Sequence, residues 1–208
     1  NEDSLTLLKE CGISINNGKD QLMAQASNFR LDVLYLRNSD IPQYVRDGVA
    51  DIAIIGDNTE KEKKTGIRHV LDLGFSRCRL SIAVPKNVDF QDISYLQGKK
   101  IATSYPNSLK DFLTENDIEA EIHEISGSVE IAPNIGLADA ICDLVSSGST
   151  LFKNGLKEVY KIFESQAILV ANSGLCGEKQ ELLAQLVFRI KAVLAAKYNK
   201  YILLNAPE

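Results

Sequence analysis

SGSVEIAPNIGLADAICDLVSSGSTLFKNG, residues 126–155, is the stretch around which the rest of the chain is organised. Residues 138–145 within it are mostly apolar and predict a buried strand. A turn of small residues ends this strand before a helix that is expected to begin at Leu151. A hydroxyl-rich turn with free N–H groups at a helix start is typical of a phosphate site. The turn consists of Ser146, Ser147, Gly148, Ser149 and Thr150.

Three carboxylates accompany the predicted strand. Asp143 lies at its carboxyl end beside the loop, where it can accept hydrogen bonds from ribose hydroxyls or hold a metal through water. Asp139 in the same strand and Glu130 upstream strengthen this interpretation. Phosphate donors next to diol acceptors indicate a sugar phosphate. The alternative is an ordinary strand–turn–helix connection with a solvated aspartate, because Ser/Gly turns are common.

Composition limits the class of protein and of partner. With 208 residues, 45% of them apolar and 25% charged, the chain can form one large α/β domain or two small lobes. The formal net charge of −5 argues against a nucleic-acid partner. No apolar run is long enough to span a bilayer, so no membrane association is expected.

The cysteines and histidines show no metal-ligand spacing. His69 and His123 stand alone in predicted strands, and structural roles are favoured for both. The four cysteines form no C-x-x-C pair, so they are expected to be buried, reduced thiols of a cytoplasmic protein. These cysteines are Cys11, Cys78, Cys142 and Cys176.

Strand and helix signals alternate along the chain, which predicts a mainly parallel sheet with helices on its faces. Residues 13–27 are typical of a β-hairpin with its turn at 16–18. Helices are predicted at 2–10, from the cap Asp40 to Gly48, at 57–64, 106–116 and 178–198. Strands are predicted at 31–37, 50–56, 77–85, 99–105, 119–125, 157–165, 166–172 and 200–207.

An internal echo indicates two similar lobes. GVADI at 48–52 is matched by GLADA at 136–140, and each motif begins a predicted strand. Lobe one is expected to hold residues 1–79 and 168–208, with the hinge and the C-terminal helix, and lobe two residues 80–167. The predicted fold class is α/β, with two lobes of parallel or mixed sheet and flanking helices, as in type II periplasmic-binding-like proteins. The cleft between the lobes is the expected ligand site.

The motifs resemble those of a known family. GSVEIAPNIGLADAICDLVSSGSTL at 127–151 closely resembles the signature of ATP phosphoribosyltransferase, which catalyses the first step of histidine biosynthesis. The resemblance covers nearly the whole chain, and its 130–150 motif is far more specific than a generic glycine loop. Supporting matches are LRNSDIP at 36–42, GVADIAIIG at 48–56, CRLSIAVP at 78–85, KIATSYP at 100–106 and KYILLNAP at 200–207.

The resemblance implies a reaction and its partners. Members of the family displace pyrophosphate from phosphoribosyl pyrophosphate (PRPP) with N1 of ATP, and they require Mg2+. The substrates are therefore expected to be ATP and PRPP. The family's core forms homodimers, and higher oligomers are expected where a regulatory domain is present. The loop 146–150 is implied to hold the 5-phosphate of PRPP. Lobe one is therefore expected to be the nucleotide side, and lobe two the PRPP-binding lobe.

The resemblance also implies roles for single residues. Asp143 and Glu130 are implied to act at the ribose hydroxyls and the magnesium–pyrophosphate group, with Asp139 in the same neighbourhood. Tyr105 is implied to be the adenine neighbour, where an aromatic ring can stack on the base. Asn58 is expected across the cleft, near the nucleotide. The sequence shows no Ser/His/Asp or Cys/His set, which agrees with a reaction that needs no covalent nucleophile.

The two ends of the chain depart from the family pattern. Members begin with a strand and a basic glycine loop that grips pyrophosphate, whereas this chain starts at Asn1, on the next predicted helix. Residues 200–207 resemble the junction to a C-terminal regulatory domain that binds histidine. The chain is therefore expected to be the catalytic core of a long form, insensitive to histidine.

Two other functions and two structural alternatives stay open at this point. A two-lobed solute-binding protein would share the architecture but show no turnover. A phosphoribosyltransferase of another base would use free purines in place of ATP. Arg79 could steer phosphates or be an ordinary strand-end charge, and Asp139 could be a structural cap at strand entry. The lysines at 61, 63 and 64 are expected on a solvated helix face.

Overall fold

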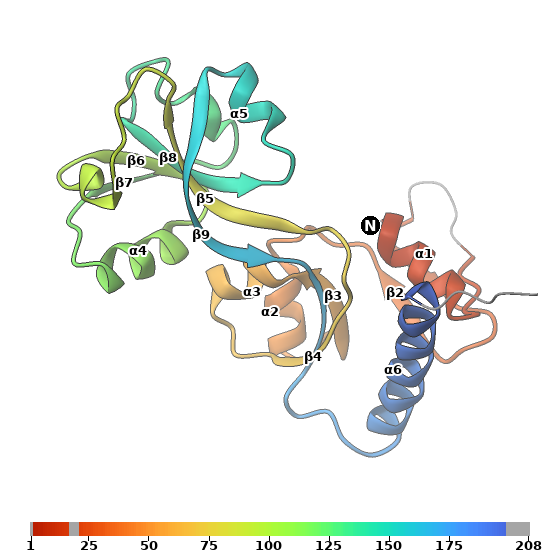
Figure 1. The fold of residues 1–208 in the computed structure, drawn as a ribbon. Coiled ribbons are helices and arrows are strands. Elements are labelled where there is room, and N and C mark those ends of the chain that lie inside the picture. Colours follow the sequence, from red (N-terminus) through yellow and green to blue (C-terminus); the bar gives the residue numbers. More distant parts are fainter. Residues whose placement is uncertain (1, 17–20, 199–208) are drawn as a thin grey trace, which may run out of the picture. The chain divides into compact units, whose positions relative to one another are not determined.

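The chain divides into two compact units (Figure 1). The structure is a computed structural model that describes residues 2–16 and 21–198. Unit 1 contains the described parts of Asn1–Ile55, Gly66–Phe75 and Ile168–Glu208, and unit 2 contains Gly56–Thr65 and Ser76–Ala167. The division predicted from the sequence put residues 56–65 and 76–79 in the first lobe. Both segments belong to unit 2. The helix within 56–65 buries polar side chains, such as Asn58 and Glu62, in unit 2.

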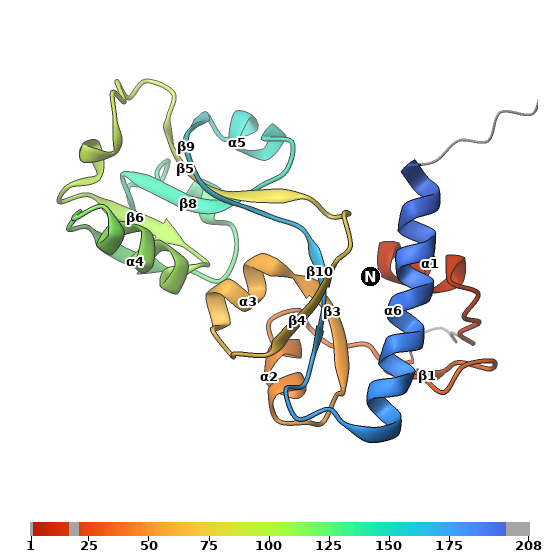
Figure 2. The ribbon, with the colours of Figure 1, turned by 60° about the horizontal axis from the view of Figure 1, so that its bottom comes forward.

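Unit 1 is built on two small sheets. β1 and β2 form an antiparallel pair, and a three-stranded sheet has the order β3-β10-β4, with β10 and β4 antiparallel. The first and last helices pack together, as Figure 2 shows, and Arg189 on α6 donates to the Cys11 carbonyl after α1 (3.3 Å). The elements are α1(Glu2–Glu10), β1(Met23–Gln25), β2(Asp32–Leu34), α2(Ile41–Arg46), β3(Ile52–Gly56), β4(Arg68–Asp72), β10(Ala167–Ala171) and α6(Gly177–Tyr198).

Several predictions in unit 1 were wrong or only partly right. The buried strand expected at 31–37 is only Asp32–Leu34, with both end residues exposed, because it pairs with β1 at the edge. In the predicted hairpin an isolated antiparallel bridge joins Ile15 to Ala26, the Ser27 N–H donates to the Ser14 carbonyl (2.9 Å), and residues 17 and 18 of the turn lie outside the described residues. Asp40 precedes α2 in a helical conformation and makes no side-chain cap bond. The strand predicted at 200–207 also lies outside the described residues.

Unit 2 is a five-stranded mixed sheet with the order β7-β6-β8-β5-β9. β6 runs parallel to β7 and β8, whereas β5 runs antiparallel to β8 and β9. The sheet is therefore mixed, as the expectation of a parallel or mixed sheet allowed, because β5 runs opposite to the other four strands of this sheet. The elements are α3(Asp57–Lys63), β5(Cys78–Pro85), η1(Ile93–Leu96), β6(Lys100–Thr103), α4(Pro106–Glu115), β7(Glu121–Glu124), η2(Val129–Ile131), β8(Ala140–Val145), α5(Ser149–Lys153) and β9(Leu156–Ser165).

The core of unit 2 positions the edge of the sheet at which the polar residues lie. Apolar side chains of β5, β6 and β8 pack against α4, and Leu80, Ile101 and Leu109 are fully buried. Since β6 and β8 are parallel neighbours, with Thr103 opposite Cys142, their carboxyl ends lie at the same edge of the sheet. Open α/β sheets bind ligands at such an edge. Tyr105 and Ser146, which follow these strands, are therefore brought to one place.

The cysteines and helices agree in part with their predictions. All four cysteines are free, and Cys11 and Cys142 are buried. Cys176 is exposed, which contradicts the expectation of a buried thiol, because it lies in the turn before α6. His69 and His123 lie in β4 and β7, as predicted, and contact the carboxylates of Asp72 and Glu121 (both 2.8 Å). None of the helices within the described ranges is both long and apolar enough to cross a bilayer.

Candidate active site

The loop after β8 is open to solvent. Ser146, Ser147, Ser149 and Thr150 are exposed, and Gly148 is half-buried with φ of +76°. The backbone N–H groups of Ser147 and Gly148 have no hydrogen-bond partner among the residues that the structure describes. The helix that follows begins at Ser149, two residues earlier than predicted, and is only five residues long. Its dipole is therefore weak, so the free N–H groups and hydroxyls must supply most of any anion binding.

Arg79 on β5 holds the first residue of this loop. Its Nη1 donates to the Ser146 carbonyl (3.1 Å) while its Nε donates to Glu158 Oε1 (2.6 Å). Ser81 Oγ also donates to Glu158 Oε1 (2.8 Å). These contacts, with the Arg79 hydrogen bond as the main cause, lower the pKa of Glu158. Arg79 thus holds the start of the loop in place, and its partner Glu158, on the neighbouring strand β9, was not predicted from the sequence.

Asp143 and Glu130 interact across the same edge of the sheet. Burial raises the pKa of the half-buried Asp143; the Leu144 N–H bond (2.8 Å) opposes this, and the charge of Glu130 adds a smaller increase. Glu130 lies in η2, before β8. Two carboxylates that repel one another favour a bound cation or hydroxyl donors, either of which relieves the repulsion.

Asp139 lies away from this pair. It precedes β8, at the end of the strand opposite the loop, where its Oδ2 accepts from the Lys100 N–H (2.9 Å). Its own N–H donates to the Lys100 carbonyl (2.8 Å). Since a strand rises roughly 3.3 Å per residue, about 20 Å separates Asp139 from the loop along β8. The structure therefore does not bring Asp139 to the expected ribose neighbourhood, and both bonds give it a structural role at strand entry.

Tyr105 and Asn58 are hydrogen-bonded neighbours in unit 2. Asn58 was expected on the other lobe, so that expectation was wrong. Asn58 Oδ1 accepts from Ser165 Oγ (2.9 Å), which directs its Nδ2 to the Tyr105 hydroxyl (3.3 Å). Burial, followed by the charge of Asp143, raises the pKa of Tyr105 to about 12. Tyr105 therefore keeps its proton at neutral pH. Because its oxygen accepts from Asn58, that proton is available to donate to a ligand.

Glu62 is a buried carboxylate that the sequence reasoning missed. It lies on α3 one turn after Asn58, and both side chains are only 7% exposed. Glu62 accepts hydrogen bonds from the first turn of α4, which follows Tyr105 directly. The signal that could have revealed it is the i, i+4 spacing of Asn58 and Glu62 on one face of a charged helix.

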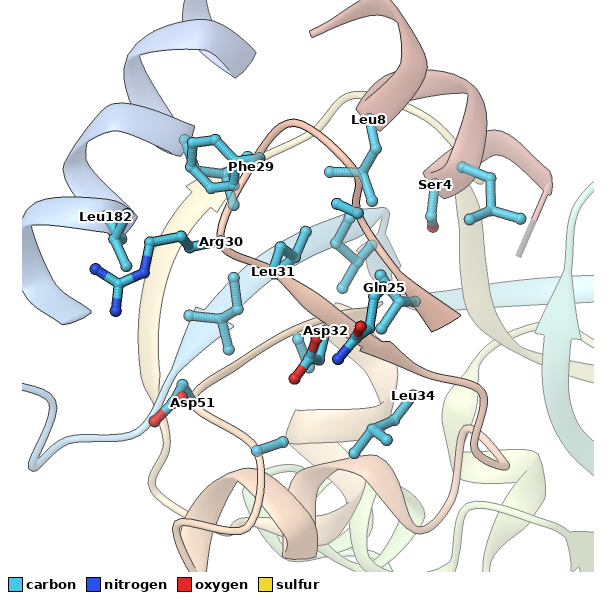
Figure 3. Close-up of a pocket in the computed structure, with 18 of the residues that line it drawn as sticks. Ser4, Leu8, Gln25, Phe29, Arg30, Leu31, Asp32, Leu34, Asp51 and Leu182 are labelled. Atoms are coloured by element: carbon cyan, nitrogen blue, oxygen red, sulfur yellow. The ribbon is translucent and has the colours of Figure 1, made fainter. Parts of the chain in front are cut away.

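A large cavity lies elsewhere in the described residues. It has a volume of about 1150 Å³ and is confined to unit 1, between α1, α6 and the strands β1, β2 and β3 (Figure 3). Its lining mixes leucines such as Leu8 and Leu31 with polar and charged side chains such as Arg30, Asp32 and Asp51, and it includes none of the predicted site residues. The polar edge of unit 2 carries the exposed loop with unpaired N–H groups, so it is the better candidate for an anion site.

The fold and the polar edge define a class: an α/β protein of two compact units with an anion-accessible loop after a central strand. The substrate-binding protein of an amino acid ABC transporter shares the fold, with a TM-score of 0.61 at 14% identity, over 94% of this chain and 81% of that one. At this identity the likeness concerns the fold alone. It confirms the periplasmic-binding-like architecture expected from the sequence.

Closer matches identify the family. The family model for ATP phosphoribosyltransferase matches residues 37–192. The ATP phosphoribosyltransferase of Cytophaga hutchinsonii is 58% identical over 207 residues, which is 100% of this chain and 72% of that protein. That of Phocaeicola vulgatus is 53% identical, over 99% of this chain and 73% of that protein. The ATP phosphoribosyl transferase (HisG:HisZ) complex from Thermotoga maritima matches with a TM-score of 0.80 at 27% identity, over 94% of both chains. The chain belongs to the ATP phosphoribosyltransferase family.

Proposed function

We propose that this chain transfers the phosphoribosyl group of PRPP to N1 of ATP and releases pyrophosphate, the first step of histidine biosynthesis. The observation that carries the proposal is the exposed Ser146–Thr150 loop, with unpaired N–H groups, in a chain of this family. A solute-binding protein without turnover is not favoured, because the structures of that class share only the fold. We assign the enzyme to the cytoplasm, which the four free cysteines support.

The loop and the acids would bind PRPP in separate ways. The free N–H groups and hydroxyls of the loop would hold the 5-phosphate. Asp143, at the carboxyl end of β8, would accept hydrogen bonds from the ribose hydroxyls. As the bond from C1 to pyrophosphate breaks, the ribose gains positive charge, which an ionised Asp143 stabilises.

Magnesium fits this edge as a companion of the substrate. Within residues 2–16 and 21–198, no three possible ligand side chains gather into a metal cage. Asp143 and Glu130 offer two carboxylates, and pyrophosphate oxygens would complete the oxygen shell that Mg2+ prefers. When bound, the ion neutralises charge on the departing pyrophosphate. Glu130 would mainly hold this magnesium-bound group.

Tyr105 and Asn58 would receive the nucleotide. The ring of Tyr105 packs on the core of unit 2 and would offer its other face to adenine. Its hydroxyl, supported by Asn58, can donate to an oxygen or ring nitrogen. Adenine N1 is already a nucleophile, so the protein needs only to align it with C1 and stabilise charge.

A spectrophotometric assay tests the function. The protein is mixed with ATP, PRPP and Mg2+, and the absorbance of N1-phosphoribosyl-ATP is followed. Product formation is expected, and adenine or hypoxanthine in place of ATP should give none. Turnover with a free purine alone would replace this function by that of another phosphoribosyltransferase, and binding of PRPP without turnover would favour a binding protein. We further propose that the core is a homodimer, which sedimentation equilibrium checks.

A further inference from the structure

Glu62 connects helix α3 to the start of helix α4. Its Oε1 accepts from the Asn107 N–H (2.9 Å), and its Oε2 accepts from the N–H (2.9 Å) and Oγ (2.7 Å) of Ser108. The Asn107 side chain donates back to the Glu62 carbonyl (3.1 Å). A carboxylate with three donors is well satisfied although it is buried.

The start of α4 needs such an acceptor. The first N–H groups of a helix have no partner inside the helix. Pro106 opens α4 and has no N–H, and Tyr105 at the N-cap position makes no side-chain cap bond. A serine or aspartate at the N-cap would satisfy these groups locally and without burying a charge from another helix. In this chain a tyrosine occupies that position, and the acceptor comes from α3.

Helix α3 therefore fixes Tyr105 in two ways, at its hydroxyl and through the backbone that follows it. Asn58 contacts the hydroxyl of Tyr105 (3.3 Å), and Glu62, one turn later, fixes the two residues that follow Pro106. We infer that Glu62 is a positioning residue that sets the place of Tyr105 for the nucleotide. The inference rests on the proposed function only for the identity of that ligand as ATP.

The test compares two substitutions on the same pair of helices. Glu62→Gln keeps the size of the side chain but turns an NH2 group toward N–H donors. Asp111→Asn is the matched control, because Asp111 on α4 forms an exposed ion pair with Lys64 at the end of α3 (2.6 Å). Glu62→Gln is expected to lower kcat/KM for ATP roughly 10- to 100-fold and to leave KM for PRPP within about twofold. Asp111→Asn should change neither.

A double-mutant cycle separates positioning from stability. If Glu62 acts through Tyr105, the effect of Glu62→Gln on kcat/KM for ATP should largely disappear in the Tyr105→Ala background. An undiminished effect, or equal effects on both substrates, would overturn the inference. Should Glu62→Gln fail to fold, Ser108→Ala removes one donor only. That variant should give a smaller loss with the same preference for ATP, and a loss shared by PRPP would count against Glu62.

A readout without turnover keeps this inference separate from the proposed function. The chain has seven tyrosines and can be labelled with 3-fluorotyrosine. The resonance that Tyr105→Phe removes should shift in Glu62→Gln and stay in place in Asp111→Asn. No product from the unmodified protein would refute the proposed function, while the fluorine spectrum would still decide whether Glu62 positions Tyr105. An unshifted resonance would overturn the inference.

Discussion

Asp143 has opposite effects on stability and on the proposed activity. Burial raises its pKa, so the folded state binds the proton more tightly than the unfolded state does. The stabilisation is therefore full below the ordinary pKa of an aspartate and is lost as the pH rises through the raised pKa of the folded state. At neutral pH the ionised side chain costs stability, and this is the form that would serve a cationic transition state.

Asp143→Asn should therefore separate the two properties. The amide has the same shape without the charge, so the free energy of unfolding at neutral pH should not fall. The activity should lose about 2–4 kcal/mol of transition-state stabilisation, roughly 30- to 1000-fold in kcat/KM for PRPP. Urea unfolding and initial rates measure both quantities. A variant with the activity of the parent would remove Asp143 from the site.

Asp139→Asn should have the reverse pattern. Its carboxylate bonds Lys100 at the far end of β8, and an asparagine can keep only the uncharged form of that bond. The free energy of unfolding should fall by about 0.5–1.5 kcal/mol. KM for PRPP should stay within about twofold, in contrast to the sequence-based expectation. A large rise in KM for PRPP would return Asp139 to the ribose neighbourhood.

At the scale of elements, β5 and β9 support the loop that follows β8. Arg79 on β5 joins Glu158 on β9 to the Ser146 carbonyl, so three strands determine where the loop begins. Because hydrogen bonds from Arg79 lower the pKa of Glu158, the ionised form stabilises the folded state. That stabilisation is full above the ordinary glutamate pKa of about 4.3 and is lost as the pH falls through the lowered value.

Glu158→Gln tests this support by its pH dependence. At pH 7 the variant should have a lower Tm than the parent and a higher KM for PRPP, because the loop loses its anchor. As the pH falls through the lowered pKa of Glu158, the two Tm values should converge, since the parent carboxyl is then protonated as well. Scanning calorimetry across this range measures the difference. A gap in Tm that persists at low pH would show that the ion pair is not its cause.

The site elements differ in how far the sequence could predict them. The β8 strand and its loop were predictable, because an apolar run that ends at the small polar residues Ser146–Thr150 is typical of a strand followed by a loop. The antiparallel pairing of β5 with β9 was not, since alternation of elements along the chain does not report strand direction. Glu62 was missed because its one sequence signal, the i, i+4 spacing from Asn58, is weak on a charged helix, and its burial becomes visible only when α4 packs against α3. The exposure of both end residues of β2 likewise depends on tertiary pairing.

At the scale of the whole molecule, the net negative charge opposes the binding of the proposed substrates. The chain has a net charge of −5, and both ATP and PRPP are polyanions. Long-range attraction therefore cannot deliver them, and binding must come from local N–H groups, hydroxyls and magnesium. Each unit has a separate apolar core, so the polar edge of unit 2 does not depend on the large cavity of unit 1 for its local geometry.

Salt should accordingly have little effect on PRPP binding. Raising the ionic strength from roughly 50 to 300 mM shortens the screening length from about 14 to 6 Å. With Mg2+ held in excess, KM for PRPP should change by less than about threefold and should not rise steeply. Initial rates at several salt concentrations measure this. A steep rise would reveal a basic surface that guides the substrate.

The exposure of Cys176 has a practical consequence. Cys11 and Cys142 are buried and Cys78 is half-buried, and burial is the main cause that raises the pKa of all three thiols. A maleimide dye applied to the native protein should therefore attach selectively at Cys176. The chain contains no tryptophan, so this single fluorophore beside α6 would provide an optical signal that the unlabelled protein lacks.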